Sequence, residues 1–430
     1  MARFADGTAQ QQRNQRRRHT LLFFRLFPLI IFALALLVVS QSFQMMQQTA
    51  HVPAVVPKPA VPEPKRLNNP EASSSVSFNR DNPFQYFSRW TGTVRPRMTS
   101  NHESLFLGVQ TNCTNWGTFR SHCAKTSSNE AKQFPYPPKQ DDHFFEWSDM
   151  IAAMLYAPQE RFHMLELGAG WAKWITDAAF MTRQLHKRIV AIGVEAQPDH
   201  CLMADWHLRN NQLSTPEQLG KDIVRMICAP VGEKDGPVDF PIDPHGSAFR
   251  GDGKFGYGIQ MLLDGKTKGV NIVKLQALGM CTLLKQDDFQ QEPVDFVSLD
   301  VQSFEHAILN EEAVECMNTL TRLVHISLHR VEANDARPLA ERFLRHGWKL
   351  IRYNPLETRS AMTHVGKVGF TDGRLTFINP RLTPPSMMTD LYDERNIHLG
   401  SYTDHEFKSK SPYPDWAPGD TMMDLVKKYS

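Results

Sequence analysis

The sequence predicts an α/β domain built on a doubly wound, mostly parallel sheet. From Phe162 onward, short apolar runs alternate with amphipathic segments, which is the pattern of repeated strand–helix–strand units. One run leads into a glycine turn that opens a helix, and three runs end in an acid, at Glu166, Glu195 and Asp300. The carboxyl ends of parallel strands share one edge of a sheet, so we expect these acids to lie close together there.

Hydrophobic periodicity and turn residues define the expected elements. Gly347 is a strong signal for the end of the helix before it. In chain order, the sequence predicts strand Phe162–Leu167, helix Trp171–Leu185, strand Ile189–Glu195, helix Pro198–Asn210, strands Val224–Ala229 and Val238–Pro241, a glycine-rich loop over 242–270, strand Val294–Asp300, a helix from about Phe304, strand Leu323–His329, helix Ala336–His346, strand Trp348–Tyr353, a hairpin over Val368–Asn379 around Asp372-Gly373, and no structure from Arg381 onward.

The composition is that of a globular protein without the charge pattern of a nucleic-acid-binding protein. Of 430 residues, 41% are hydrophobic and 22% are charged, which allows one large domain or two modest ones with tails. The 48 basic and 46 acidic side chains leave a net charge of +2. Domains that bind nucleic acid have a clear basic excess, so we expect no nucleic acid partner.

The N-terminus predicts a membrane anchor. A basic cluster at Arg13–His19 precedes an apolar run from Leu21 to Ser40, long enough for ~30 Å of helix and therefore for a bilayer core. Basic residues flank only the N-terminal side, so the positive-inside rule places residues 1–20 in the cytosol. A cleaved signal peptide is the alternative, because the uncharged stretch Leu26–Val39 also fits a signal-peptide core.

Beyond this run, six prolines between His51 and Ser75 exclude regular helix and favour an extended stem. We therefore expect a single-pass type II protein of the Golgi or endoplasmic reticulum membrane, with its main domain in the lumen. The predicted divisions are a cytosolic basic tail (1–20), a transmembrane signal-anchor helix (21–43), a proline-rich stem (44–85), an N-terminal extension that packs on the core (86–155), the main domain (156–380) and a proline-rich tail (381–430).

The six cysteines do not predict a zinc site, since none forms a C-x-x-C pair. Cys113 and Cys123 lie close together in a polar stretch, where they form a disulfide in an oxidising lumen or remain two free thiols. The remaining four lie in apolar runs and are expected to be buried small hydrophobic residues: Cys201, Cys228, Cys281 and Cys316.

The residues at the expected sheet edge favour a nucleoside ligand that carries an amine and no phosphate. The glycines of LELGAG (165–170) let a ligand approach the backbone, and Glu195 can accept both hydroxyls of a ribose. A pyrophosphate would favour a further glycine and no acid beside the turn, but Lys173 and Glu166 stand there. S-adenosylmethionine has the ribose and the amine. No residue pattern predicts a metal.

With these residues the chain resembles the FkbM family of S-adenosylmethionine-dependent O-methyltransferases, over about Phe144 to Tyr353. The segments that carry the resemblance are LELGAG, GVEAQPDH, APVGEKDGPVDF and PVDFVSLDVQSFEHAIL. In the last segment Asp300, Gln302 and Glu305 match the family's pattern, whereas Ser303 stands where glycine is usual. Ala172 likewise stands at the third glycine of the looser methyltransferase pattern.

The resemblance implies a Rossmann-like class I methyltransferase fold and a set of site residues. The cofactor S-adenosyl-L-methionine would be held by Glu166, Gly168, Gly170 and Glu195, and Asp300 would lie by its methionine end.

Methyl transfer to a hydroxyl benefits from a general base, for which histidine is the natural choice near pH 7. Strand alternation puts His325, Ser327 and His329 on one face, with His329 at the carboxyl end. His306, shortly after Asp300, is the other candidate. Each histidine has a structural alternative as a hydrogen-bonded core residue. The loop over 242–270 is expected to be either a lid that binds the acceptor or a surface insertion.

Two other functions fit parts of the sequence. Golgi-type glycosyltransferases also have an anchor, a stem and a lumenal domain, but the chain has no Asp-x-Asp sequence of the kind with which many of them bind a metal. A non-catalytic lumenal binding protein on a methyltransferase fold stays open because of Ala172 and Ser303. For a methyltransferase, the lumenal address favours a glycan or a small molecule as acceptor.

Overall fold

The structure is a computed structural model in which the chain divides into two units, Met1–Ser74 and Ser75–Ser430. The described residues all lie in the second unit. They are residues 78–79, 82–87, 102–104, 106–112, 143–157, 160–242, 271–329, 336–354, 360–363, 366–369, 372–392, 398–399 and 422–429.

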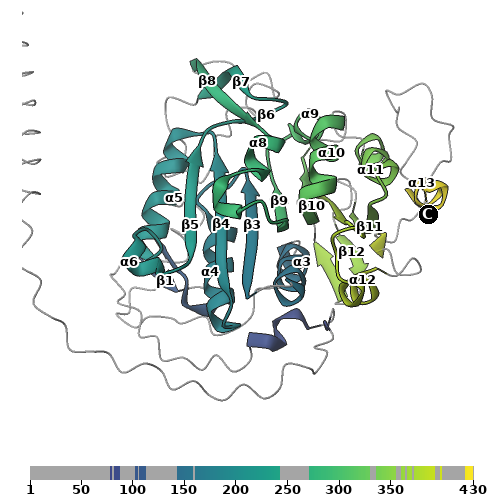
Figure 1. The fold of residues 1–430 in the computed structure, drawn as a ribbon, viewed down its shortest axis with the longest axis horizontal. Helices are drawn as coiled ribbons and strands as arrows, with labels where there is room; N and C mark the ends of the chain where they lie inside the picture. The colour runs from purple at the N-terminus through teal and green to yellow at the C-terminus, as the bar shows by residue number, and fades with distance from the viewer. Residues whose placement is uncertain are drawn as a thin grey trace, which may run out of the picture. The chain divides into compact units, whose positions relative to one another are not determined.

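The centre of this unit is an eight-stranded sheet in the order β15-β11-β14-β10-β9-β3-β4-β5 (Figure 1). All neighbouring strands are parallel except β14, which runs antiparallel to both β10 and β11. This order, with one reversed strand inserted near one end, is that of the class I methyltransferase fold. The strands are β3 (Arg161–Leu167), β4 (Arg188–Glu195), β5 (Ile223–Cys228), β9 (Val294–Leu299), β10 (Thr321–Leu328), β11 (Lys349–Asn354), β14 (Gly373–Ile378) and β15 (His398–Leu399).

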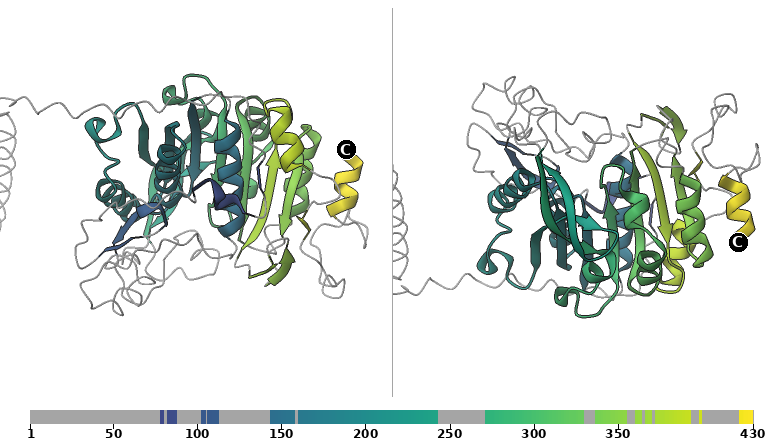
Figure 2. Two further views of the ribbon diagram at one scale, coloured as in Figure 1. Left: turned by 90° about the horizontal axis from the view of Figure 1, so that it is seen from below. Right: turned by 90° about the horizontal axis from the view of Figure 1, so that it is seen from above.

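Both faces of the sheet are buried, which confirms the doubly wound arrangement (Figure 2). Along β3, Phe162 and Met164 point to one core, and Leu165 and Leu167 to the other, as strand alternation requires. The first core contains α3 (His143–Tyr156), α4 (Lys173–Gln184), α5 (Pro198–Asn210), α12 (Pro385–Leu391) and the short helix η1 (Pro83–Phe87); the second contains α8 (Met280–Leu284), α10 (Glu311–Leu320), α11 (Ala336–Arg345) and α13 (Met422–Tyr429).

A small second sheet of three strands continues from the carboxyl end of β5. Its order is β6-β8-β7, and β7 and β8 extend beyond the main sheet at the top of Figure 1. The sequence predicted part of β7 but not β8, whose alternating exposure shows a strand with one open face. Residues 243–270, which were predicted to form a long loop, lie outside the described residues. The strands are β6 (Val231–Gly232), β7 (Gly236–Ile242) and β8 (Asn271–Gly279).

The helix expected from about Phe304 begins at Glu305 as α9 (Glu305–Ile308), and a second helix, α10, follows it. Two other predictions for the second half of the chain were wrong. The predicted hairpin at Val368–Asn379 does not form, because β13 (Gly366–Gly369) pairs with β12 (Ser360–Thr363) while β14 inserts between β10 and β11. The tail after Arg381 contains α12, β15 and α13, of which α12 and α13 bury apolar residues against the core.

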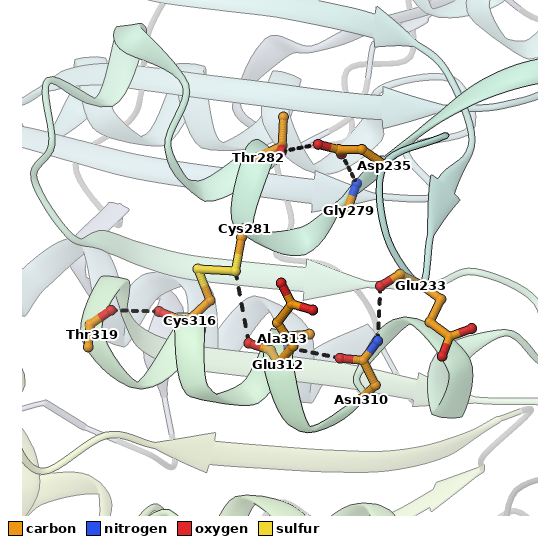
Figure 3. Close-up of a disulfide and its surroundings, with 10 residues drawn as sticks. All are labelled: Glu233, Asp235, Gly279, Cys281, Thr282, Asn310, Glu312, Ala313, Cys316 and Thr319. Carbon is orange, nitrogen blue, oxygen red and sulfur yellow. Dashed lines mark hydrogen bonds between the residues drawn. A yellow bond between two sulfur atoms is a disulfide. The ribbon is translucent and has the colours of Figure 1, made fainter. Parts of the chain in front are cut away.

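The four cysteines expected to be buried small hydrophobic residues are paired in two disulfides, and of the four Cys201 and Cys316 are buried. Cys201 of α5 is joined to Cys228 at the end of β5, and Cys281 of α8 is joined to Cys316 of α10. Figure 3 shows the second pair beside the turn that connects β6 to β7, where Asp235 accepts hydrogen bonds from the Gly279 amide and the Thr282 hydroxyl. The prediction failed because parallel strand pairing brings distant apolar segments together. Cys113 and Cys123 lie outside the described residues.

Buried polar groups fix α3 across the sheet. The carboxylate of Asp149 lies 2.9 Å from His325 Nδ1 and 3.0 Å from Arg352 Nη2, and it also accepts a hydrogen bond from Thr376. Burial alone would raise the pKa of Asp149, but the charges of Arg352 and His325 outweigh it and lower that pKa to about 2. His325 is therefore a structural residue beneath α3, the alternative considered for the histidines of this strand.

No helix among the described residues is both long and apolar enough to cross a membrane. The predicted anchor over 21–43 lies outside these residues, as does most of the predicted stem.

Candidate functional site

The site is built around the turn between β3 and α4, and its geometry depends on Gly168. Gly168 has a φ of +75°, and a Cβ added there would lie 1.7 Å from the backbone carbonyl oxygen of Asp300. The Asp300 amide in turn donates to the carbonyl of Leu167 at 2.8 Å. Only glycine allows the first turn and the end of β9 to approach so closely. The turn after β3 and the end of β9 thus meet as predicted, and they meet through their backbones.

Gly170 and Glu195 form the second part of the site. The Gly170 amide donates to Glu195 Oε2 at 2.8 Å, and the Gln197 amide donates to Oε1 at 2.8 Å. The carboxylate is thereby held at the turn, with one further lone pair on each oxygen. A Cβ added to Gly170 would meet no atom of the described residues within 4 Å, so these residues leave open space beside this glycine.

Glu166 faces the other way. It is buried, and its two oxygens accept hydrogen bonds from the amides of Trp174 at 3.4 Å and Ile175 at 3.0 Å in the first turn of α4. Burial raises the pKa of Glu166 well above its usual value, and these backbone bonds offset the shift only in part. The contacts favour a positioning role, in which Glu166 fixes α4 behind the glycine turn, over the direct cofactor contact that the resemblance implied.

The third part of the site is a cluster at the carboxyl ends of β9 and β10. His329 Nε2 lies 3.0 Å from Asp300 Oδ1, and His329 Nδ1 lies 2.7 Å from Glu305 Oε1. The side-chain amide nitrogen of Gln302 lies 2.8 Å from the same Asp300 oxygen and 3.0 Å from His329 Nε2. Glu305 is fully buried and the His329 side chain is 7% exposed, whereas the Asp300 side chain is 44% exposed. Asp300 is thus the open member of the cluster.

The charges in this cluster determine its protonation. Burial alone would lower the pKa of His329, but the carboxylates of Asp300 and Glu305 on its two nitrogens outweigh it and raise that pKa well above its usual value. Partial desolvation by its neighbours would raise the pKa of Asp300, but the charge of His329 outweighs this effect and keeps that pKa below its usual value. Arg374, buried on β14, acts on Asp300 in the same direction. The cluster therefore contains an imidazolium ion paired with carboxylates.

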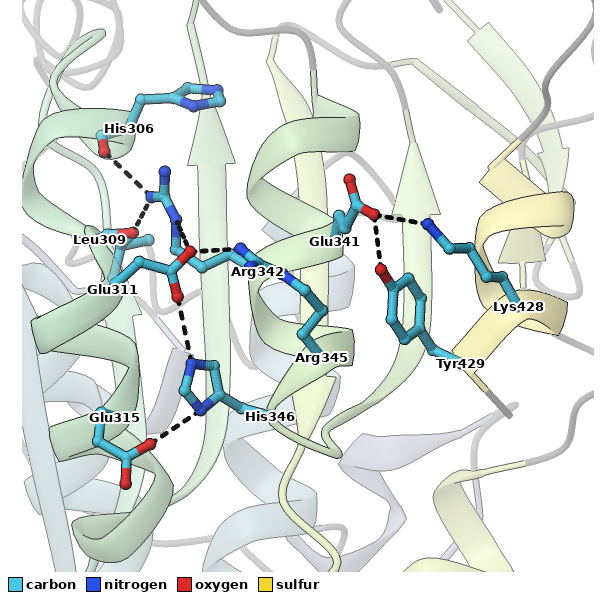
Figure 4. Close-up of polar contacts among 10 residues, drawn as sticks. All are labelled: His306, Leu309, Glu311, Glu315, Glu341, Arg342, Arg345, His346, Lys428 and Tyr429. Carbon is cyan, nitrogen blue, oxygen red and sulfur yellow. Dashed lines mark hydrogen bonds and ion pairs between the residues drawn. The ribbon is translucent and has the colours of Figure 1, made fainter. Parts of the chain in front are cut away.

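His306 has different surroundings. Its carbonyl oxygen accepts a hydrogen bond from Arg342 Nη1 at 3.3 Å, on the side where α10 packs against α11 (Figure 4). In that figure the imidazole of His306 points away from Glu311, which pairs with Arg342, Arg345 and His346. A catalytic role for His306 stays a prediction.

Sequence reasoning did not assign a role to Glu305, although the residue belongs to the segment that carries the family resemblance. It also treated Ala172 and Ser303 as departures from glycine. Both adopt left-handed backbone conformations, with φ of 64° and 81°, and Gln302 has a φ of 55°. The chain therefore keeps the backbone conformation that glycine would favour at these positions, at a cost of about 1 kcal/mol for each residue.

The residues fit S-adenosylmethionine in three respects. The space beside Gly170 would admit a ligand at the turn. Glu195 keeps acceptor capacity for ribose hydroxyls. The exposed carboxylate of Asp300 matches a cationic methionine end. Among the described residues, no group of three or more histidine, cysteine, aspartate or glutamate side chains is arranged to hold a metal.

No protein-family model matches the chain, and no curated protein matches it. Among solved structures, the chain is similar to an O-methyltransferase from Bacillus cereus in complex with SAH, at 15% identity over 56% of this chain and 84% of that chain, with a TM-score of 0.26. It is also similar to the methyltransferase FkbM from Methylobacillus flagellatus (12% identity, 55% of each chain, TM-score 0.31). A third is the O-methyltransferase TomG from Streptomyces achromogenes in complex with SAM (11% identity, 63% of this chain and 99% of that chain, TM-score 0.27). The strand order of this chain is what places it in the class I methyltransferase fold.

Proposed function

We propose that the protein is an S-adenosylmethionine-dependent methyltransferase that acts on a hydroxyl oxygen of a glycan or small molecule on the lumenal side of a membrane. The observation that carries the proposal is that two carboxylates and an open space lie at one sheet edge. These are the carboxylate of Glu195 fixed at the Gly170 amide, the open space beside Gly170, and the exposed carboxylate of Asp300. A nucleoside with a cationic end satisfies all three.

The chain's own residues perform binding and proton handling. Glu195 and the glycine turn would hold the ribose, and Asp300 would lie between the methionine end and the acceptor. When bound, the cofactor would supply an electrophilic methyl group. Asp300 would accept the hydrogen bond of the acceptor hydroxyl and would take up its proton. This geometry contributes mainly by alignment, which is the larger part of catalysis in such a displacement.

The disulfides support the lumenal part of the proposal. Cys201–Cys228 and Cys281–Cys316 both lie within the folded domain and join separate elements. Disulfides of this structural kind persist in oxidising compartments and are rare in the cytosol. Together with the apolar run at Leu21–Ser40, they favour a type II membrane protein with its domain in the lumen of the Golgi or endoplasmic reticulum.

The first test is binding of S-adenosylmethionine to the full-length chain, measured by titration calorimetry in detergent. We expect binding, and we expect Glu195→Gln to weaken it at least tenfold, which corresponds to about 1.4 kcal/mol. Glu315→Gln is the matched control, because Glu315 is exposed and pairs with His346 on the outer surface. Equal affinity in the wild type and Glu195→Gln would contradict the proposed site.

The second test separates the competing functions. A glycosyltransferase would bind a nucleotide sugar in place of S-adenosylmethionine, and a non-catalytic binding protein would transfer no methyl group. Full-length protein is incubated with methyl-labelled S-adenosylmethionine and a panel of glycans. We expect label on at least one hydroxylated acceptor, and the label should be lost in Asp300→Asn.

A further inference from the structure

We propose that Glu305 is a positioning residue that holds His329 as a fixed cation behind Asp300, so that Asp300 is the member of this cluster that meets the acceptor. The inference deepens the proposed function and rests on it for the identity of the acceptor. It gives His329 a different role from the general base predicted from the sequence.

Both ring nitrogens of His329 lie beside carboxylates. His329 has two ring nitrogens, and a carboxylate oxygen lies within hydrogen-bond distance of each, at 3.0 Å from Asp300 and 2.7 Å from Glu305. A general base needs a free nitrogen directed at the proton that it removes. When both nitrogens carry a proton, each has a carboxylate oxygen within hydrogen-bond distance, so His329 has no free nitrogen with which to accept a further proton.

Burial increases through the cluster from Asp300 to Glu305. Glu305 is fully buried, His329 is 7% exposed and Asp300 is 44% exposed. The three side chains therefore form a row from the interior to the surface. The amide of Ser303 also donates to Glu305 Oε1 at 3.1 Å, which anchors the inner end of the row to the backbone. A molecule that approaches from solvent meets Asp300 first.

Two further charged residues, Asp372 and Arg374, lie near the cluster. On the side of β14, Asp372 lies 4.0 Å from His329 Nε2, and it too is acidic. The cation next to the cluster is Arg374, which donates to Ser327 and acts electrostatically on Asp300. The described groups that face His329 directly thus comprise Asp300, Gln302, Glu305 and Asp372, and their net effect favours the imidazolium form. The open edge presents carboxylates, which favours a neutral or cationic acceptor over a phosphate or carboxylate.

The experiment follows the His329 imidazole by NMR in the full-length chain labelled with [13C-ε1]histidine, with the signal assigned from His329→Gln. In the wild type we expect the titration midpoint of His329 to lie well above 6.5, the ordinary value for histidine. Glu305→Gln should lower its titration midpoint by at least one pH unit, and Glu305→Asp, which keeps the charge, should restore most of that shift. Glu315→Gln should leave the midpoint unchanged.

A second readout tests which carboxylate faces solvent. Carbodiimide-driven coupling of an amine, mapped by mass spectrometry, should modify Asp300 and spare Glu305. If Glu305→Gln does not fold, Asp300→Asn carries the NMR test with the same expected direction. A wild-type His329 that titrates near 6.5, the ordinary value for histidine, would overturn the proposal. If S-adenosylmethionine binds normally but His329 titrates near 6.5, this proposal is wrong and the proposed function stands. If S-adenosylmethionine does not bind but His329 stays protonated, only the proposed function is wrong.

Discussion

The two halves of the main sheet hold their site residues in different ways. On the β3–β4–β5 side, the site consists of glycines and of backbone amides that bind the carboxylates of Glu166 and Glu195. On the β9–β10–β14 side, charged side chains bind one another in ion pairs, as in the Asp300–His329–Glu305 row. The first half therefore depends on backbone shape and the second on charge. Substitutions should accordingly damage the two halves by different mechanisms.

Gly168→Ala should have the largest effect and should break the contact between the halves. The added Cβ would lie 1.7 Å from the Asp300 carbonyl oxygen, so backbone must move. We expect a loss of more than about 4 kcal/mol in the free energy of unfolding, measured by urea denaturation with circular dichroism. Gly170→Ala is the control, because nothing lies within 4 Å of its Cβ, and it should cost about 1 kcal/mol. Similar stabilities for the two variants would show that the contact is unimportant.

Asp149→Asn should have the next largest effect, because it leaves Arg352 buried without its carboxylate. We expect a loss of about 3 to 5 kcal/mol at pH 7. The pKa of Asp149 is lowered from 3.8 to about 2 by folding, so the stabilisation by its charge is present above pH 4 and disappears as the pH falls toward 2. Urea denaturation of both proteins across this range should show the gap closing. A gap that stays constant would refute this assignment.

Removal of either disulfide should cost about 3 to 4 kcal/mol, since the two bonds span similar separations of 27 and 35 residues. Their effects on the cofactor should differ. Cys201 Sγ lies 3.3 Å from the Glu195 carbonyl oxygen. The double variant Cys201→Ser/Cys228→Ser should therefore weaken S-adenosylmethionine binding about tenfold. Cys281→Ser/Cys316→Ser should lose stability but keep affinity in calorimetry, and equal losses of affinity would contradict the distinction.

The smallest effects are expected for Ala172→Gly and Ser303→Gly. Glycine relieves the left-handed conformation at both positions but increases the entropy of the unfolded chain. These contributions oppose each other, so each variant should remain within about 1 kcal/mol of the wild type in thermal unfolding. A loss well above this value at Ser303 would indicate that its side chain stabilises the β9–β10–β14 side.

The sequence predicted the β3–β4–β5 side better than the β9–β10–β14 side. The strands and helices from Arg161 to Cys228 follow local periodicity, and the glycine turn and Glu195 lie within one stretch of chain. The role of His325 could not be predicted in this way, because its partner Asp149 is 176 residues away and lies on another element. The position of β14 between β10 and β11 also depends on long-range pairing, which local turn residues do not specify.

The cysteine prediction failed for a related reason, although a signal was present. Cys228 of β5 is paired in register with Glu195 of β4. Cys201 lies near the start of α5, the helix that follows Glu195. Once the parallel order of these strands is assumed, the two cysteines are neighbours. The hydrophobicity of a single apolar run does not show which other run lies beside it in the fold. The same applies to Cys281 and Cys316, which lie on packed helices.

The contact between Gly168 and the Asp300 backbone has a consequence for recognition. No side chain separates the two segments, so the turn after β3 and the end of β9 form one continuous floor to the site. Binding to such a preformed floor would lose little conformational freedom. We expect the shape of this floor to decide selectivity between nucleosides, and the segments around it to decide which acceptors fit.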